Sequence, residues 1–496
     1  MSFREHDPNQ STFAWMNYRA ILKNDHPACV INDIVDYVGT DEIEATYNKV
    51  GNPAYHPRMM VKILIYGDYQ GYYGGRPLYN NFKTDLGLRY LTADKFPDHR
   101  TINEFRIKFK NEFADIFTKV VIICVNLGLV AFENLAIDSQ KIKANANLFQ
   151  NKNIKGIGRE MEKIKAQIIQ IQEQEANTTV IPQQLQRKHA TLEHRDRKIQ
   201  DALKILKEAG GEASNDIRYN LTDPESKVMT DKTGAKHPDY LCHNAVDDKC
   251  QVITGIKVTN IPTDAGQLMP LKEESKKNTG RPHKNTEADC GYSTAGEYRR
   301  MAADTETQYY VPDRTMRCSK NDPYSKWNFI YSREDDAFFC SQARPLYLKR
   351  IGKDQFGEEY FVYESEDCSG CPVRDLCLKK MKVKEGDGGE ESPPSNCQNR
   401  TITIYSEDEL KRAMREKLDS EEGKKIYQRR MSTVELVHGD MQLNRGFTQF
   451  HLRGLDKVTV EYVLLVIAHN IRKIILHGFH AFQQFIHGGQ STPVPS

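Results

Sequence analysis

Three acidic residues in three different settings are the first candidates for chemistry in this chain. Asp138 lies in the middle of a strand-like segment, residues 134–145. Asp289 ends a short strand-like segment just before an expected helix start, and Glu435 lies inside a long helical stretch, residues 424–438. Two aspartates on strands and a glutamate on a helix can converge on a pair of divalent ions, and such a pair can cut a phosphodiester bond. An accidental triplet is the alternative, because the chain holds 68 acidic residues.

A cluster of cysteines late in the chain is the second candidate. Cys368, Cys371 and Cys377 supply three thiols within ten residues, and Cys340 and Cys397 are the candidates for a fourth. Thiolates at this C-x2-C spacing bind Zn²⁺ tetrahedrally, and a small region with little apolar content gains stability from such an ion. The spacing predicts a structural zinc site, with a set of reduced, unligated cysteines as the alternative. A catalytic cysteine is not indicated, because no His or Asn partner pattern accompanies the cluster.

The bulk composition bounds the class of protein. A chain of 496 residues forms about two to four domains, and its formal net charge of +2 means that any binding of nucleic acid requires local basic surface. The amino terminus lacks the apolar core of a signal peptide, and no run of eighteen apolar residues could span a bilayer. Eleven dispersed cysteines, an odd number, favour a reducing compartment over a disulfide framework. We therefore expect a cytoplasmic protein without a membrane segment.

The amino-terminal region, residues 13–125, is predicted to be helical. Apolar residues recur at helical spacing in 58–66 and 101–109, and Pro57 and Pro97 stand at or just before helix starts. A helical bundle that displays basic side chains could follow a phosphate backbone, whereas any single basic residue could equally belong to a solvated helical face. The basic residues expected on this surface are Arg76, Lys83, Arg89, His99, Arg100 and Arg106.

Strands and helices alternate in the rest of the chain, apart from two insertions. One insertion is a pair of antiparallel helices, broken by a turn at residues 177–182, and the other is a Cys-rich segment before the last long helix. The order of the remaining elements describes an α/β fold in which helices flank a mixed sheet. The expected elements are a strand in 130–149, helices in 156–210, a strand hairpin in 240–259, a helix at 264–277, the Asp289 strand, a helix at 293–303 and a strand at 307–312.

Several short motifs come one after another in an order that resembles the transposases of bacterial insertion sequences, in the DDE superfamily. No single motif is specific, but together they extend over most of the chain. The closest resemblance is to the branch with an amino-terminal helical DNA-binding region and a β-rich insertion before the catalytic glutamate. The motifs are PDHRTIN at 97–103, AIDSQKIKANA at 136–146, NLTDPES at 220–226, ADCGY at 288–292, VELVHGD at 434–440, LRGLDKV at 452–458 and AHNIRK at 468–473.

The resemblance implies an RNase H-like catalytic core that is interrupted by two insertions. The expected organisation is a helical DNA-binding domain at 1–128, a catalytic core in three parts at 129–155, 213–312 and 421–496, a helical hairpin at 156–212 and a Cys-rich β insertion at 313–420.

The family's catalytic acids fall on Asp138, Asp289 and Glu435. The resemblance implies Mg²⁺- or Mn²⁺-dependent hydrolysis at the transposon ends, and then attack of the freed 3′-hydroxyl on target DNA. Carboxylate oxygens are the ligands that Mg²⁺ prefers. The expected partners are double-stranded DNA, as transposon ends and as target, and a second copy of the chain in a homodimer on paired ends. The expected location is the nucleoid of a bacterial cytoplasm.

The chain departs from the family pattern around the glutamate. Related transposases place a Tyr, an Arg and a Lys on the helical face of the glutamate. Tyr427 and Arg430 stand one residue too far from Glu435, and in a continuous α-helix Arg430 would point roughly 140° away from it. We therefore expect Tyr427 and Arg430 to be DNA contacts. His438 shares the face of Glu435, and either packs and hydrogen-bonds there or approaches the scissile phosphate. The family positions hold Gln428, Met431 and Gln442.

Four further basic residues are expected to contact DNA. Lys141 and Lys143 come after Asp138 in its strand but project from the opposite face. Arg445 and Arg453 lie in the carboxy-terminal block of motifs.

Three other functions compete with transposition. The first is a metal-dependent nuclease of the same fold that cuts DNA without joining it. The second is a noncatalytic DNA-binding protein derived from a transposase, against which the intact set of three acids speaks. An RNA nuclease is the least favoured, because readers of single strands interleave exposed aromatic and basic residues, and only residues 69–73 hint at such a pattern.

Overall fold

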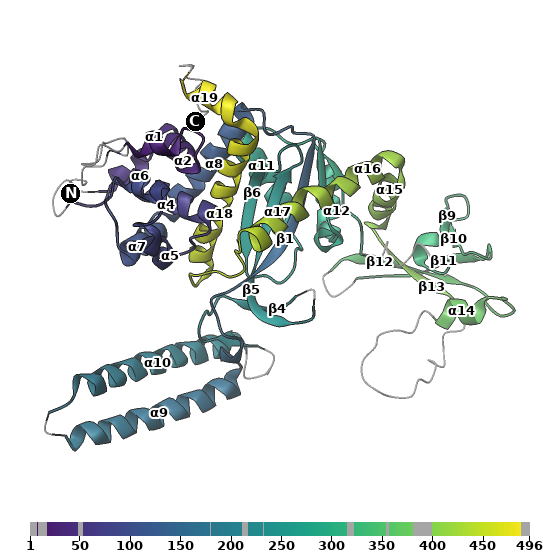
Figure 1. The fold of residues 1–496 in the computed structure, drawn as a ribbon. Helices are drawn as coiled ribbons and strands as arrows, with labels where there is room; N and C mark the ends of the chain where they lie inside the picture. Colours follow the sequence, from purple (N-terminus) through teal and green to yellow (C-terminus); the bar gives the residue numbers. More distant parts are fainter. Residues whose placement is uncertain are drawn as a thin grey trace. The chain divides into compact units, whose positions relative to one another are not determined.

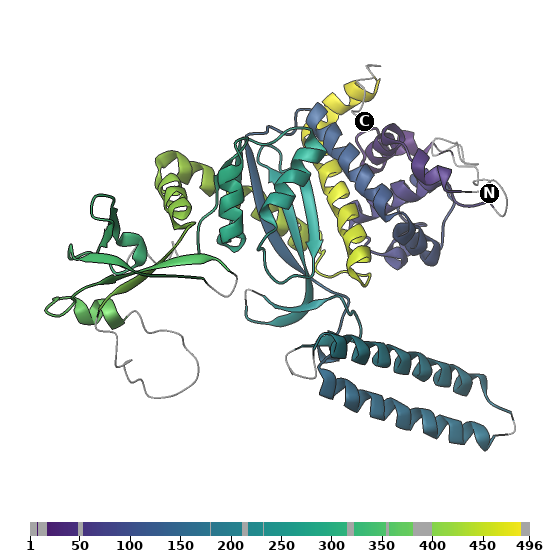
Figure 2. The same cartoon turned by 180° about the vertical axis from the view of Figure 1, so that it is seen from behind.

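Two compact units divide the chain in the computed structural model (Figures 1 and 2). The first comprises Met1–Asp264, Leu271–Pro282 and Met431–Ser496, and the second comprises Ala265–Pro270 and His283–Arg430. Helices and sheets occur in both units, so the mixed α/β class predicted from the sequence is confirmed. The described residues are 7, 17–47, 53–178, 180–210, 217–231, 233–314, 322–353, 357–379 and 399–487.

The amino-terminal region of the first unit is helical, as predicted. Two of its helices begin at a capping side chain. Pro57 is the first residue of α4, and the ring nitrogen of the preceding His56 accepts a hydrogen bond from the Arg58 amide; Asp98 accepts hydrogen bonds from the first backbone amides of α7. The helices are α1 (Tyr18–Leu22), α2 (Pro27–Val38), α3 (Asp41–Ala45), α4 (Pro57–Gln70), α5 (Gly75–Asn81), α6 (Leu86–Thr92), α7 (His99–Lys108) and α8 (Lys110–Asn126).

Gly75 allows the first turns of α5 and α7 to approach closely. A Cβ atom at this position would lie 2.5 Å from the backbone oxygen of His99, which cannot move without moving α7. We expect Gly75→Ala to lower the free energy of unfolding by about 1–3 kcal/mol, because overpacking forces a backbone shift. Chemical denaturation measures this change. Gly158→Ala is the control, since nothing lies within 4 Å of its new Cβ, and it should be neutral or stabilising by up to about 1 kcal/mol.

β1 and β5 are the central strands of the sheet in the first unit. They pair antiparallel, and Asp138 stands directly opposite Asn244. Along its other edge β5 pairs with β4 and then with β6, which confirms the predicted strand hairpin. In the second half of β1 the even-numbered residues are buried, whereas Lys141 and Lys143 are exposed. The elements are β1 (Asn134–Lys143), β4 (Lys227–Thr230), β5 (Lys236–Asp247), β6 (Ile253–Thr259) and the helix α11 (Leu268–Thr279) that comes after them.

The predicted pair of antiparallel helices is also present. α9 (Ile154–Ala176) and α10 (Gln183–Glu208) lie side by side and reach away from the end of β5 (Figures 1 and 2). Ile157, Ile164 and Ile199 are buried between the two helices. A short turn η1 (Leu148–Gln150) and the strand pair β2 (Asn151–Lys152) and β3 (Tyr219–Asn220) close the base of the hairpin.

α18 (Leu455–Lys473) is the central helix of the first unit and packs against α4, α8 and β6. It is buried almost throughout. The carboxylate of its buried Glu461 accepts hydrogen bonds from the backbone amides of His451 and Leu452 at 3.0–3.1 Å, and lies 2.8 Å from Nδ1 of His451. Glu461 therefore ties the preceding loop to α18. The π-helix η6 (Ile474–Gly478) and α19 (Phe479–His487) come next.

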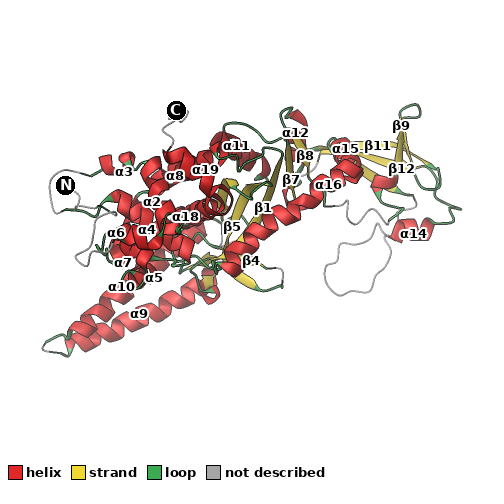
Figure 3. Ribbon diagram, turned by 45° about the horizontal axis from the view of Figure 1, so that its top comes forward, coloured by secondary structure: helices red, strands yellow, loops and turns green. Residues whose placement is uncertain are grey.

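The second unit contains a parallel pair of strands and an antiparallel five-stranded sheet of order β13-β12-β11-β10-β9 (Figure 3). Phe329, Phe338, Leu346, Tyr363 and Ile402 form the core of the five-stranded sheet. Residues 382–395, for which the sequence favours a loop, lie outside the described residues. The elements are β7 (Asn285–Ala288), η2 (Cys290–Tyr292), α12 (Ala295–Ala303), β8 (Gln308–Tyr310), η3 (Lys326–Asn328), β9 (Ile330–Ser332), β10 (Ala337–Phe339), β11 (Pro345–Lys353), β12 (Glu359–Ser365), α14 (Arg374–Lys379), β13 (Thr401–Tyr405), α15 (Asp408–Asp419) and α16 (Glu421–Arg430).

Candidate active site

Asp138 lies half-buried near the middle of β1. The backbone amide of Ser139 donates a hydrogen bond of 2.8 Å to Oδ1 of Asp138, which orients the carboxylate. Asn244 of β5 is directly opposite in the antiparallel register. Side chains that are directly opposite project from the same face of a sheet, roughly 5 Å apart at Cβ. Asn244 therefore marks the face of the sheet on which the Asp138 carboxylate stands.

Glu435 is the last residue of a π-helix, η4 (Met431–Glu435), which packs against β1 and β5. Its side chain is exposed. His438 lies three residues further along, in α17 (Leu436–Gly439), and its Nε2 is 3.0 Å from Nδ2 of Asn244. Residues three apart share a helical face, so Glu435 and His438 project toward the same side. Asn244 thus joins the strand of Asp138 to the helix of Glu435 within the first unit.

A buried hydrogen-bonded group lies beneath this face. The hydroxyl of Tyr462, in α18, is 2.7 Å from Nδ2 of Asn244 and 3.0 Å from Nε2 of Gln140. Burial raises the pKa of Tyr462 above its ordinary value, so the hydroxyl stays neutral and can both donate and accept. Sequence reasoning missed Asn244 and Tyr462. The sequence offered no specific signal for either residue, because β5 contains several other polar residues, such as Asp239 and His243.

Asp264 is another acid that sequence reasoning missed. The hydroxyl of Ser139 donates to Oδ1 of Asp264 at 2.6 Å, and Nδ1 of the buried His243 lies 3.6 Å from the same oxygen. Burial lowers the pKa of His243 to about 3, so its ring is neutral at physiological pH. Ser139 and His243 are opposite each other in the β1–β5 register, on the face away from Asp138. Asp264 therefore braces β1 from behind the candidate site.

Asp289 belongs to the second unit. It comes directly after β7, is half-buried, and accepts a hydrogen bond of 2.8 Å from the backbone amide of Gly291 at the start of η2. α16 packs against β7 in the same unit. Burial raises the pKa of Tyr427 in α16, the guanidinium of Arg430 opposes this rise, and the Asp289 carboxylate adds to it. The Arg430 guanidinium lies over the Tyr427 ring, 5.8 Å from its centroid. The structure therefore gathers Asp289, Tyr427 and Arg430 in one place.

The helical stretch that carries Glu435 is not a regular α-helix. α16 ends at Arg430, and the next five residues, ending at Glu435, are π-helical. A π-helix closes its hydrogen bonds from residue i to i+5, so one π turn holds one residue more than an α turn. The angle expected for Arg430 applies to a continuous α-helix, and this stretch is not one. Tyr427 and Arg430 are each one residue further from Glu435 than the family pattern requires. One π turn adds one residue, which matches this difference. A second π-helix, η5 (Asp440–Asn444), comes after α17.

The structure separates the predicted basic residues into exposed and buried groups. The expectation that Arg106 is displayed on the surface is wrong, because its side chain is 2% exposed within the helical core. Arg445 is also buried, at 9% exposure, and donates to the backbone oxygen of Asp68. Neither can follow a phosphate backbone from inside the protein. The exposed members of the predicted set are Arg76, Lys83, Arg100, Lys141, Lys143 and Arg453, and the half-buried ones are Arg89, His99, Tyr427 and Arg430.

Two of the exposed basic residues have internal partners as well. Nζ of Lys141 donates to the backbone oxygen of Thr230 at 2.6 Å, and Nε of Arg453 donates to the backbone oxygen of Asn145 at 2.9 Å. If these side chains turned toward a DNA phosphate, each would replace its internal hydrogen bond with one to the phosphate.

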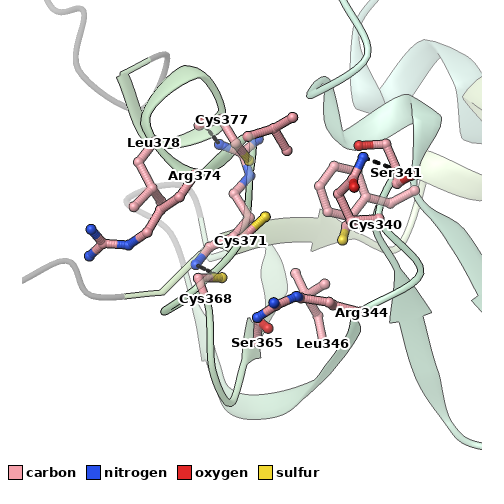
Figure 4. Close-up of a pocket in the computed structure, with 14 residues that line it drawn as sticks. Cys340, Ser341, Arg344, Leu346, Ser365, Cys368, Cys371, Arg374, Cys377 and Leu378 are labelled. Carbon is pink, nitrogen blue, oxygen red and sulfur yellow. Dashed lines mark hydrogen bonds between the residues drawn. The ribbon is translucent and has the colours of Figure 1, made fainter.

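The four cysteines Cys340, Cys368, Cys371 and Cys377 line one cavity in the second unit (Figure 4). Burial raises the pKa of the Cys377 thiol, Arg400 opposes this rise, and the other three cysteines add to it. Cys397 lies outside the described residues. Across the described part of the chain, no group of three or more His, Cys, Asp or Glu side chains already stands in a metal-holding arrangement. Among the helices of the described segments, none combines the length and apolar character that a bilayer crossing requires.

Two family models match the chain. A model described as a transposase DDE domain matches residues 339–475, which include Glu435 and the four cysteines of the cavity. A model described as a transposase domain (DUF772) matches residues 16–108, which include Arg76 and Arg100. No curated protein matches the chain. No solved structure matches it either.

Proposed function

Because the chain is a DDE transposase of the insertion-sequence type, we propose that it cleaves DNA at transposon ends and joins the freed 3′-hydroxyl to target DNA in a Mg²⁺-dependent reaction. The observation that carries this proposal is the contact of Asn244 with His438. It connects the strand of Asp138 with the helix of Glu435, two residues almost three hundred positions apart in the sequence.

Asp289 is proposed to be the third acid of the site. Asp289 comes directly after a strand. Its carboxylate accepts a hydrogen bond from a backbone amide, as the carboxylate of Asp138 does. Three carboxylates on two strand segments and a helix are the donor set that Mg²⁺ takes together with waters and substrate phosphate oxygens. A pair of such ions would lower the pKa of the attacking water or 3′-hydroxyl and stabilise the leaving oxygen.

The surrounding side chains are proposed to position the acids and the DNA. Asn244 and Tyr462 hold the face of Asp138 rigid, since both are fully buried and bonded to each other. Tyr427 and Arg430, beside Asp289, would contact DNA close to the scissile phosphate, where a guanidinium pairs well with phosphate oxygens. His438 keeps its hydrogen bond to Asn244 and so orients the helix of Glu435, as the packing interpretation of this residue predicts.

Three finer features belong to the same proposal. The antiparallel β1–β5–β6 arrangement and the parallel β7–β8 pair suit an RNase H-like core divided by insertions. Cleavage and joining of two ends by one enzyme favour a homodimer on paired ends. The dispersed free cysteines favour a reducing cytoplasm, where the substrate is the DNA of the nucleoid.

A cleavage and strand-transfer assay tests the proposal. The DNA flanking the coding region is searched for inverted terminal repeats, and the full chain is incubated with those ends, Mg²⁺ and a supercoiled target. We expect end cleavage, and a joined product from a substrate whose 3′ end is already cut. Cleavage without joining would support the nuclease alternative. Binding of the ends with neither reaction would support the noncatalytic alternative.

The exposed arginines of the helical region give a quantitative prediction for DNA binding. Each phosphate that a protein neutralises contributes about −0.9 to the slope of log K against log salt concentration. We expect Arg76→Ala and Arg100→Ala each to weaken binding and to make the slope shallower by about 1, because each removes one phosphate contact. Fluorescence anisotropy over a salt titration measures both effects. Lys165→Ala, on the exposed side of α9, is the control and should leave the slope unchanged. A slope close to zero for the unmodified chain would contradict the assignment of a DNA partner.

A further inference from the structure

The cavity formed by the four cysteines is a compact space at the edge of the five-stranded sheet. Its volume is about 20 Å³, which is room for one water-sized or ion-sized occupant. Cys340 directly follows β10, whereas Cys368, Cys371 and Cys377 lie in the segment that leads from β12 through α14. Figure 4 shows Cys340 on one side of the space and the other three on the side of α14. The thiols that line this cavity therefore come from two separate segments of the chain.

The charged residues around the cavity are positive, which suits a metal ion whose thiolate ligands give the centre a net negative charge. Arg344, Arg374 and Arg400 line it, and the described lining residues include no carboxylate. The backbone amide of Arg400 also donates a hydrogen bond of 3.3 Å to Sγ of Cys368. Four thiolates around one divalent cation carry a net charge of −2, so the arginines and the amide would offset the charge of a tetrathiolate centre. Arg344 and Arg400 also donate hydrogen bonds to the backbone oxygens of Asp367 and Cys377, so their side chains are already held beside the cavity.

The backbone of both segments is folded so that thiols can converge. Between Cys368 and Cys371 the chain turns at Gly370, whose φ of +61° favours glycine, and the amide of Cys371 donates to the oxygen of Cys368. After Cys340 the chain turns at Ala343, with φ of +54°, and the amide of Cys340 donates to the oxygen of Arg344 at 3.0 Å. A left-handed residue in a C-x2-C turn brings its two sulfurs to one side.

Apolar packing does little to hold α14 in place. The segment from Cys368 to α14 contributes no residue to the described core of the five-stranded sheet. α14 has only six residues, and Leu376 within it is 58% exposed. A short helix with so little buried apolar surface needs another attachment, and a structural metal supplies one in small regions of this kind.

We propose that Cys340, Cys368, Cys371 and Cys377 bind one Zn²⁺, which fastens α14 and the preceding turn to the end of β10. The sulfurs reach the tetrahedral distance of about 2.3 Å by rotation of their side chains into the shared space. Each ligating thiol gives up its proton, so binding of one ion releases four protons to solvent. The ion is structural, because four protein ligands leave no open position for substrate, and the site is independent of the acids that carry the proposed function.

Metal analysis of the full chain tests this proposal without any DNA reaction. We expect elemental analysis to find about one zinc per chain after purification without chelator. Cys371→Ser should lose the zinc, whereas Cys371→His should keep it, because an imidazole nitrogen is also a zinc ligand. Cys250→Ser is the control, since this thiol belongs to the first unit, and it should retain the full zinc content.

Two further readouts separate a bound ion from a folding defect. In the unmodified chain a strong chelator should expose four additional thiols to a thiol reagent and should speed up proteolysis near α14. Cobalt exchanged into the site should give the visible absorption of a tetrahedral thiolate complex. An unmodified chain that is free of zinc, that contains iron instead, or whose four cysteines form disulfides would overturn the proposal. These outcomes do not depend on whether the chain cuts DNA.

Discussion

Replacement of Asp138 by Asn is expected to reduce end cleavage and strand transfer by at least about 1000-fold, equivalent to about 4 kcal/mol of activation free energy. Asn keeps the size of the side chain and can still receive the amide hydrogen bond of Ser139, but it carries no negative charge to hold a divalent ion. Single-turnover cleavage of an end-containing duplex with Mg²⁺ measures the effect.

The affinity of this variant for DNA and its thermal stability should stay close to those of the unmodified chain, because the change is isosteric and half-exposed. Glu133→Gln is the matched control, since it removes an exposed carboxylate just before β1, and it should cleave normally. Asp138→Asn with undiminished cleavage would contradict the catalytic assignment and would leave only a DNA-binding role.

The second large effect is expected on stability, at Glu461. This buried carboxylate accepts hydrogen bonds from two backbone amides, those of His451 and Leu452, and contacts the ring of His451. Burial raises the pKa of Glu461. The hydrogen bond from His451 and the charge of Arg106 lower it by a larger amount, so the pKa lies below the ordinary value. We expect Glu461→Gln to lower the free energy of unfolding at neutral pH by about 3 kcal/mol, because it removes a buried negative charge that interacts with His451 and Arg106. Urea denaturation of the full chain measures this loss.

The pH dependence of this effect has a definite sign. A carboxyl group whose pKa is lowered by folding stabilises the folded state above its unfolded pKa of about 4.3, and the contribution is lost as the pH falls through the lower folded pKa. The difference in the free energy of unfolding between Glu461→Gln and the unmodified chain should therefore have its full size at pH 7 and should become smaller in strong acid. Asp456→Asn is the control, because the Asp456 carboxylate is 76% exposed in its ion pair with Lys110, and its loss should cost less than about 1 kcal/mol.

The sequence predicted most elements because their patterns are local. The helix starts at Pro57 and just after Pro97, the paired helices around the turn at 177–182, and the strand hairpin between β5 and β6 all depend on residues close together in the chain. The order of these elements is enough to predict the mixed α/β class. It does not predict their tertiary partners, because contacts between distant segments leave no periodic signal in one sequence.

The misplaced arginines show where this limit lies. Arg106 and Arg445 carry the same charge as the exposed Arg76 and Arg100, but the helical core and Asp68 surround them. The sequence of a polar helix face looks the same whether that face is exposed to water or packed against a buried ionic group. Only the three-dimensional packing distinguishes the two, and so the predicted surface contained both kinds.

The acids Asp138, Asp289 and Glu435 come from residue type and motif and stay a prediction. Asn244 and Tyr462, which support the face of Asp138, belong to no motif and act through contacts between distant segments. The π-helix before Glu435 was missed for a different reason. Its residues, Met431 to Glu435, have no composition that separates a π turn from an α turn. The shifted spacing of Tyr427 and Arg430 was its only trace.

A crystal structure of the full chain with a transposon-end duplex and Mn²⁺ in place of Mg²⁺ would test the central claim most directly. Anomalous scattering locates the manganese ions without reference to the protein. We predict one or two manganese peaks with oxygens of Asp138, Asp289 and Glu435 at about 2.1 Å, and with the scissile phosphate between them. Manganese bound elsewhere, or manganese bound in the DNA complex without an oxygen of Asp289, would contradict the account.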